Sequence, residues 1–191
     1  MEIEKRRVYA IVDFDALDQN VQAMEEKLPQ DVGMMAVIKT NAYGHGAKAI
    51  AKHLEDNDRI SGYAVATAEE ALELRKAGIG KMILILGYVF EKDYEDLILQ
   101  DIRFGIYRKD VAQALDAAAE KCHKKALIHI KIDTGIHRIG YPVCQESVEE
   151  IKEIAGLKHL CLEGIFTHFA RADEADKSYA KKAYGLFKDM I

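Results

Sequence analysis

A short apolar run, a turn and an amphipathic stretch follow one another six times along the chain, and this repetition constrains the fold more than any other feature. Apolar runs of strand length that alternate with helical patterns are typical of a parallel sheet covered by helices. The predicted strands are residues 34–38, 63–65, 82–86, 104–107, 126–132 and 162–167. The predicted helices are residues 47–54, 68–77, 94–100, 109–121, 146–155 and about 175–190. A further strand at residues 8–14 and a helix at residues 16–28 are expected before this series, which makes the chain an α/β protein.

Six strand–helix units are compatible with two architectures. One is a doubly wound open sheet of six strands. The other is a TIM-type (β/α)8 barrel truncated after about six units, since a closed barrel needs eight units and typically about 250 residues. The length of 191 residues favours the open sheet. The polar residues at the predicted strand ends favour the barrel, whose active sites lie at that end of the strands, and we predict the barrel.

Composition excludes several classes of partner. The formal net charge of −5 argues against nucleic-acid binding and against attraction to an anionic membrane. No apolar stretch reaches the roughly 20 residues that span a bilayer, and the N-terminal segment lacks the pattern of a secretory signal. The three cysteines are not in metal-ligand spacing and are predicted to be reduced thiols. We therefore expect a cytoplasmic protein with no nucleic-acid or membrane partner.

Lys39 directly follows the apolar run at residues 34–38. A lysine is expensive to bury unless it is paired or used, and its amine can form a Schiff base when the surroundings keep it neutral. The alternative is a lysine that simply reaches solvent at the end of a strand. Lys39 is nevertheless the first candidate for a chemical role.

The predicted fifth strand presents polar groups on one face. Because side chains alternate along a strand, His129, Lys131 and Asp133 share one face and isoleucines occupy the other. In a barrel the isoleucines face the helices, so the polar set points inward. Arg138, in the loop that follows, is expected at the same end of the barrel, where it could bind a carboxylate through two hydrogen bonds. An edge strand with one wet face, together with a surface arginine, is the alternative.

His168 directly follows the predicted sixth strand, where it could titrate, stack on a ring, bind metal or be a satisfied core histidine. Four histidines near strand ends lack the spacing of metal ligands, and no dense carboxylate set joins them, so we predict no metal site. These are His45, His129, His137 and His168.

Three segments resemble the alanine racemase family of pyridoxal-phosphate enzymes. They are AVIKTNAYGHG at 36–46, KIDTGIHRIG at 131–140 and EGIFTHFA at 163–170. The resemblance covers the chain from about residue 8 onward. It implies that residues 1–191 are the N-terminal pyridoxal-phosphate-binding barrel domain, incomplete, with two further strand units and a C-terminal β-domain absent. It also implies a homodimer for the full-length enzyme.

The resemblance implies a role for each matching residue. Lys39 would carry pyridoxal 5'-phosphate as an aldimine and act as one of two catalytic bases, with Tyr43 beside it near the phosphate. Arg138 would contact the cofactor and the substrate carboxylate. Lys131 matches a lysine that is often carbamylated in the family, and His168 would lie under the cofactor ring.

The implied function is interconversion of L- and D-alanine, which supplies D-alanine for cell-wall peptidoglycan. Racemisation needs a base on each face of the substrate. In the family the second base is a tyrosine from the β-domain, so we predict that the isolated chain is inactive. Three alternatives stay open: a racemase of serine or another amino acid, a non-catalytic pyridoxal phosphate carrier or homeostasis protein, and a non-catalytic fragment or interaction domain derived from a racemase.

Overall fold

The computed structural model describes residues 8–191 and contains one sheet in which all paired strands are parallel. Its neighbour order is β1-β2-β3-β4-β5-β6, and β7 also pairs with β5. The strands are β1 (Met34–Val37), β2 (Ile60–Val65), β3 (Met82–Ile85), β4 (Ile102–Ile106), β5 (Ala126–Asp133), β6 (Tyr141–Pro142) and β7 (Leu160–Thr167). Six of them match the predicted strands, and the two-residue β6 was not expected.

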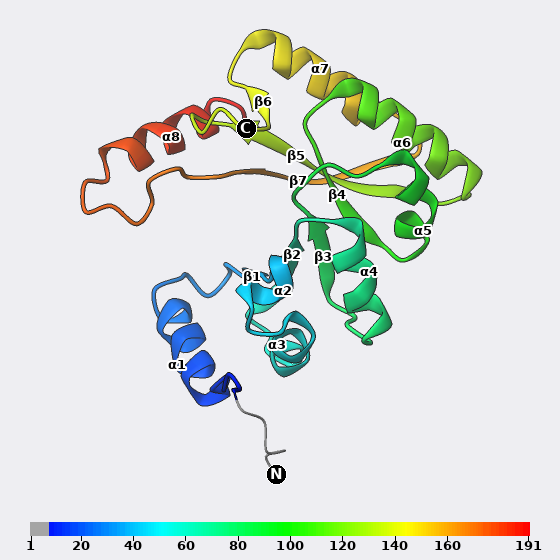
Figure 1. Ribbon diagram of the computed structural model, residues 1–191. Helices are drawn as coiled ribbons and strands as arrows, with labels where there is room; N and C mark the ends of the chain where they lie inside the picture. Colours follow the sequence, from blue (N-terminus) through cyan, green and yellow to red (C-terminus); the bar gives the residue numbers. More distant parts are fainter. Residues whose placement is uncertain (1–7) are drawn as a thin grey trace.

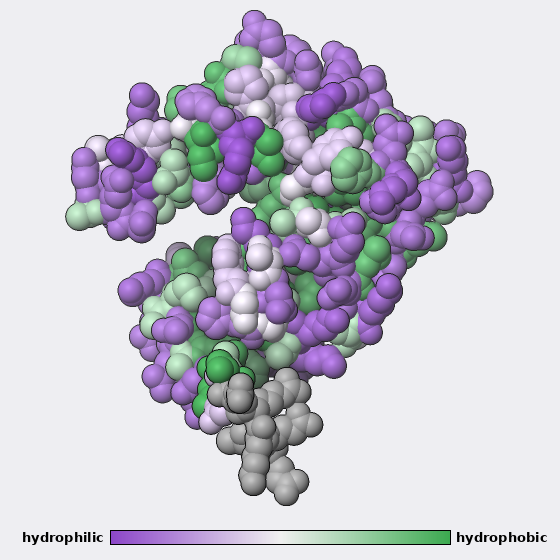
Figure 2. Space-filling view, viewed as in Figure 1, coloured by the Kyte–Doolittle hydropathy of each residue, from purple (hydrophilic) through white to green (hydrophobic). Residues whose placement is uncertain are grey.

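Helices connect the strands in the predicted rhythm. They are α1 (Phe14–Glu25), α2 (Lys39–Tyr43), α3 (Ala47–Leu54), α4 (Ala68–Lys76), α5 (Tyr94–Leu99) after the short η1 (Glu91–Asp93), α6 (Lys109–Lys121), α7 (Gln145–Ala155) and α8 (Ser178–Lys188). In Figure 1, α4 to α7 lie along one side of the curved sheet, whereas α8 stands apart, beyond β6. Hydrophilic residues cover most of the surface over α4 to α7 (Figure 2). No helix within residues 8–191 is long and apolar enough to cross a membrane.

The strand order decides between the two architectures. A doubly wound sheet reverses its order at a switch point. Here each new strand–helix unit adds its main strand on the same side of the preceding one, from β1 to β5 and on to β7. The resulting sheet curls into a half-barrel (Figure 1). The prediction of a TIM-type barrel truncated after about six units is therefore confirmed.

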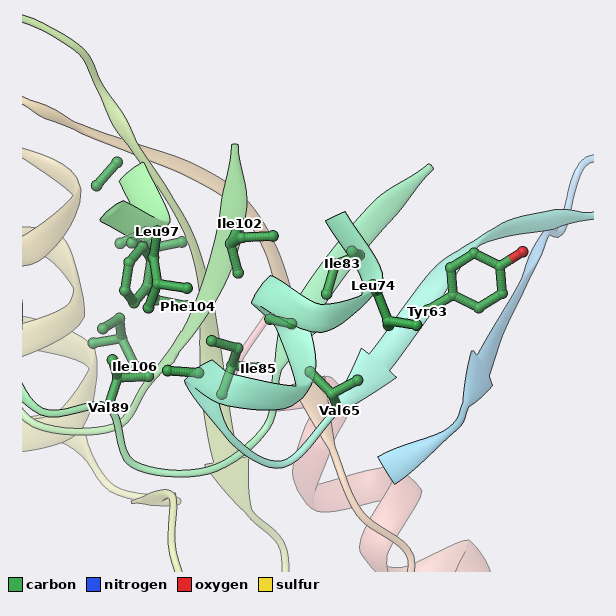
Figure 3. Close-up of a cluster of buried hydrophobic side chains, with 14 of the residues drawn as sticks. Tyr63, Val65, Leu74, Ile83, Ile85, Val89, Leu97, Ile102, Phe104 and Ile106 are labelled. Carbon is green, nitrogen blue, oxygen red and sulfur yellow. The ribbon is translucent and has the colours of Figure 1, made fainter. Parts of the chain in front are cut away.

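Apolar side chains from the strands and outer helices form the core shown in Figure 3. Ile85 of β3 is in register with Phe104 of β4, and both are buried. Tyr94 of α5 meets the Phe104 ring edge to face, with 5.8 Å between ring centroids. Such contacts between strand and helix explain why near-continuous apolar runs form the strands, since these positions are closed to water.

The predicted strand at residues 8–14 is wrong. Residues 8–13 have no regular structure, and Val8 and Ile11 are 86% and 78% exposed. Apolar residues form a strand only where a neighbouring backbone accepts and donates the ladder hydrogen bonds, and no strand within the described residues pairs with this segment. The chain instead enters α1, where the Asp13 side chain accepts a hydrogen bond from the Ala16 N–H at 3.0 Å.

Candidate functional site

A cleft of about 460 Å³ lies beside the carboxyl ends of the strands. It contains the five side chains to which the family resemblance gives a role, and these come from three separate parts of the chain. They are Lys39, Tyr43, Lys131, Arg138 and His168. Within the part of the chain that the structure describes, the rest of the lining is mostly apolar and includes no aspartate or glutamate. The cleft is therefore electropositive, which suits an anionic ligand.

Lys39 follows the last ladder bond of β1, in which the Ile38 N–H donates to the Ala64 carbonyl at 2.9 Å. The four residues after it, 40–43, have φ of 53–54°, so α2 is a left-handed turn. The left-handed conformation costs roughly 1–2 kcal/mol for each residue with a Cβ. Asn41 offsets part of this cost, because its side-chain oxygen accepts from the N–H of Ala47, the first residue of α3, at 2.9 Å. Nothing in the sequence indicated these left-handed residues, which precede Gly44 and Gly46.

Lys131 is 4% exposed and points into the cleft, as the alternation along β5 predicts. Burial lowers its pKa, and the positive charges of Arg138 and Lys39 lower it further. Its Nζ lies 5.7 Å from the centre of the Phe166 ring. The neutral amine is thus favoured relative to an ordinary lysine, and a neutral amine is the nucleophilic form.

Asp133 corrects one prediction, because it does not line this cleft. Its Oδ1 accepts from the N–H groups of residues 135, 136 and 137 at 2.9–3.1 Å, and its Oδ2 accepts from the Arg138 N–H at 3.1 Å. Burial acts to raise the pKa of Asp133, but the four hydrogen bonds outweigh it and the pKa is lowered. Asp133 therefore folds the loop that carries Arg138.

A polar group that sequence reasoning missed lies on the inner side of the sheet. Arg103 of β4 donates from Nε and Nη2 to the two carboxylate oxygens of Glu163 on β7, at 2.9 and 3.3 Å. The ring of His129, which lines the cleft, has its Nε2 3.6 Å from Glu163. Burial lowers the pKa of His129, and Glu163 opposes the shift. A Cβ on Gly164 would meet His129 Nδ1 at 2.8 Å, so the ring requires glycine there.

His168 and Tyr43 are exposed at the cleft, Tyr43 by 61%. Burial lowers the pKa of His168, and the charges of Arg138, Lys131 and Lys39 add to the effect. His168 directly follows β7, which is joined to β5 at this point because the Thr167 hydroxyl donates to the Ile132 carbonyl at 2.9 Å. Within residues 8–191, no three His, Cys, Asp or Glu side chains gather as metal ligands would, and the three cysteines are unpaired.

Comparison with known proteins identifies the family of the chain. Residues 12–191 match the family model described as alanine racemase, N-terminal domain. The chain belongs to the alanine racemase N-terminal domain family. The resemblance inferred from the sequence motifs is thereby confirmed.

Several alanine racemases about twice its length are similar to this family member. It is 39% identical over 186 residues to the alanine racemase of Methanococcus maripaludis, covering 96% of this chain and 49% of the relative. It is 42% identical over 190 residues to alanine racemase 2 of Caldanaerobacter subterraneus, covering 100% and 48%. The solved alanine racemase of Clostridium difficile 630 superposes with a TM-score of 0.89 at 41% identity, covering 92% and 46%. The chain thus spans about half the length of the relatives it matches.

Proposed function

We propose that this chain is the cofactor-binding barrel portion of an alanine racemase and that it holds pyridoxal 5'-phosphate covalently on Lys39. One observation carries the proposal: a member of this family places Lys39, at the end of β1, in one cleft with Lys131, Arg138 and His168. The substrate is L- or D-alanine, and the D-alanine formed would serve peptidoglycan synthesis. The full-length enzyme is proposed to be a homodimer.

The residues of the cleft fit this cofactor. Within residues 8–191, no carboxylate lies within salt-bridge distance of the Lys39 amine or lines the cleft. A cleft that combines basic side chains with apolar walls suits a ligand that combines an aromatic ring with a phosphate. When bound, the cofactor supplies a conjugated ring that takes up the electron pair left when the Cα–H bond of the amino acid breaks.

The chain's own residues have separate tasks in this proposal. Lys39 holds the cofactor and, once the substrate amine has displaced it, moves a proton to or from Cα on one face. Arg138, on the loop folded by Asp133, binds the substrate carboxylate. Tyr43 and His168, which also line the cleft, would help to hold the phosphate and the ring of the cofactor.

Lys131 is proposed to be carbamylated. Its neutral amine adds to CO2, which forms an N–C bond and releases one proton. The product carries a negative charge and would attract Arg138, whereas the ammonium form repels it. The lowered pKa of Lys131 supports this reaction, because burial and the neighbouring cations favour the amine.

Serine or another small amino acid remains an alternative substrate. A pyridoxal phosphate carrier is an alternative function, because it would keep Lys39 without needing a second base. Since racemisation requires a base on each face of Cα, and Lys39 serves one face, we propose that the 191-residue chain alone turns over very slowly. Near-normal racemase turnover by the isolated chain would contradict this part.

Cofactor attachment is tested directly by incubating the chain with pyridoxal phosphate, reducing with borohydride and mapping the labelled lysine by mass spectrometry. We expect labelling at Lys39, and its loss in Lys39→Ala. Lys48→Ala is the matched control, since Lys48 is exposed and paired with Glu73 at 3.2 Å. A folded chain that labels at scattered lysines, or at none, would refute the proposal.

A further inference from the structure

The ladder between β1 and β2 stops at Lys39 and leaves two backbone donors free. In a continued parallel ladder, Ala66 N–H would donate to the Ile38 carbonyl and Thr40 N–H to the Ala66 carbonyl. Instead the Ile38 carbonyl accepts from the Ala42 N–H at 2.9 Å, because the chain turns left-handed after Lys39. Thr40 N–H and Ala66 N–H therefore need another acceptor.

One carboxylate accepts both hydrogen bonds. Glu70 Oε1 accepts from the Thr40 N–H, and Glu70 Oε2 accepts from the Ala66 N–H at 2.7 Å. Glu70 lies in the first turn of α4, where its own N–H donates to the Thr67 side chain at 3.3 Å. The carboxylate is thus held at a helix N-terminus, where a negative charge is favoured. It joins the two diverging chain segments where the backbone ladder no longer does.

We infer that Glu70 is a positioning residue for Lys39, because its carboxylate fixes the start of the left-handed turn that directs Lys39 into the cleft. The residues of this turn occupy a conformation that side chains with a Cβ disfavour, so a contact at its first N–H is needed to hold it. Ala66, the other donor, itself lines the cleft. The inference deepens the proposed function and rests on it for the task of Lys39.

Only a carboxylate meets this geometry. In the Glu70→Gln variant the side chain would offer one acceptor oxygen, and its amide NH2 would face the second backbone N–H, donor against donor. The matched control lies one turn further along α4. Glu73 is exposed and pairs with Lys48 at 3.2 Å, so Glu73→Gln changes the net charge equally and leaves both backbone bonds intact.

The first measurement is amide hydrogen exchange at single-residue resolution in the wild-type chain, Glu70→Gln and Glu73→Gln. In Glu70→Gln we expect amide exchange at Thr40 and Ala66 to accelerate roughly tenfold or more. This is the change in rate that corresponds to the free energy of one charge-assisted hydrogen bond. Exchange at Ile38, which still donates to Ala64, should not change, and Glu73→Gln should match wild type. An unprotected Thr40 amide in the wild-type chain would overturn the inference even if Glu70→Gln failed to fold.

The second measurement follows Lys39 itself. In CO2-free buffer, where Lys131 keeps a free amine, acetic anhydride acylates lysines without any cofactor, and the ratio of Lys39 to Lys131 labelling reports how accessible each amine is relative to the other. General destabilisation would change both lysines together, whereas loss of the Glu70 contact should change this ratio by roughly tenfold. Pyridoxal phosphate trapping at Lys39 should slow by a similar factor in Glu70→Gln.

The two proposals fail in different ways. If wild-type Lys39 is acylated but never trapped by pyridoxal phosphate, the proposed function fails, and Glu70 is still judged by exchange and by the acylation ratio. If Glu70→Gln keeps the wild-type exchange at Thr40 and the wild-type ratio, the role of Glu70 is refuted, and cofactor attachment stands on its own result.

Discussion

Replacing Asp133 by asparagine should loosen the loop that carries Arg138. The carboxylate accepts four backbone N–H groups, three at Oδ1 and one at Oδ2. Asparagine keeps one oxygen, loses the charge and turns its NH2 toward the Arg138 N–H. Hydrogen bonds to a charged acceptor contribute about 1.5–3 kcal/mol against about 0.5–1.5 for neutral pairs. Allowing for the partial exposure of this site, we expect a loss of about 2–3 kcal/mol in the free energy of unfolding.

The effect should depend on pH in a defined direction. Because the pKa of Asp133 is lower in the folded chain than in the unfolded chain, its contribution is fully present above the ordinary aspartate pKa of about 4. The contribution is lost as the pH falls through the lowered folded-state pKa. The stability difference between wild type and Asp133→Asn should therefore be largest near neutral pH and shrink at about pH 3.5.

Urea unfolding at the two pH values and amide exchange at residues 135–138 measure this. Asp176→Asn is the control, since exposed Asp176 also accepts a backbone bond, from the Ser178 N–H at 2.9 Å. That variant should change stability far less and leave exchange at residues 135–138 unaltered. A stability loss in Asp133→Asn that is equal at both pH values, or unchanged exchange in this loop, would refute the reasoning.

Three further outcomes follow from the site. In CO2-free buffer, Lys131→Met should raise the free energy of unfolding at neutral pH by about 1 kcal/mol. The reason is that a protonated lysine whose pKa is lowered in the folded chain destabilises that chain. A lower free energy of unfolding for the variant in urea would contradict this. Gly164→Ala should destabilise by about 1–3 kcal/mol through its clash with His129, whereas Gly185→Ala, which meets nothing within 4 Å in α8, should be neutral or stabilising. NMR titration of His168 should give a pKa below that of a free histidine, and a raised value would show that the cationic surroundings are wrong.

The pattern of apolar and polar residues was sufficient to predict most of the helices and strands. The helices at Ala47–Leu54 and Lys109–Lys121 agree with the predicted bounds, because the amphipathic period of a helix depends only on residues close together in the chain. The same logic failed at residues 8–14, where apolar residues have no strand beside them. Whether an apolar segment becomes a strand depends on a partner that the segment itself does not contain.

Some residues of the candidate site could likewise be placed from the sequence, and others could not. Alternation along β5 placed Lys131 in the interior, and the position of Lys39 after an apolar run placed it at a strand end. Asp133 was predicted on the same wall, but its side chain turned to the loop. Four backbone N–H groups of the loop donate to the Asp133 carboxylate and hold it away from the cleft. A pattern of polar and apolar residues does not show which hydrogen-bond donors will surround a side chain.

The sequence by itself thus determined the strand–helix rhythm, the family and the lysine that opens the site, since each depends on residues close together in the chain. Only the tertiary structure decided how that lysine is held. The Thr40–Glu70 bond spans 30 residues and the Arg103–Glu163 pair spans 60. Such contacts form only when the curled sheet brings the strand ends together, so the sequence pattern around either residue does not predict them.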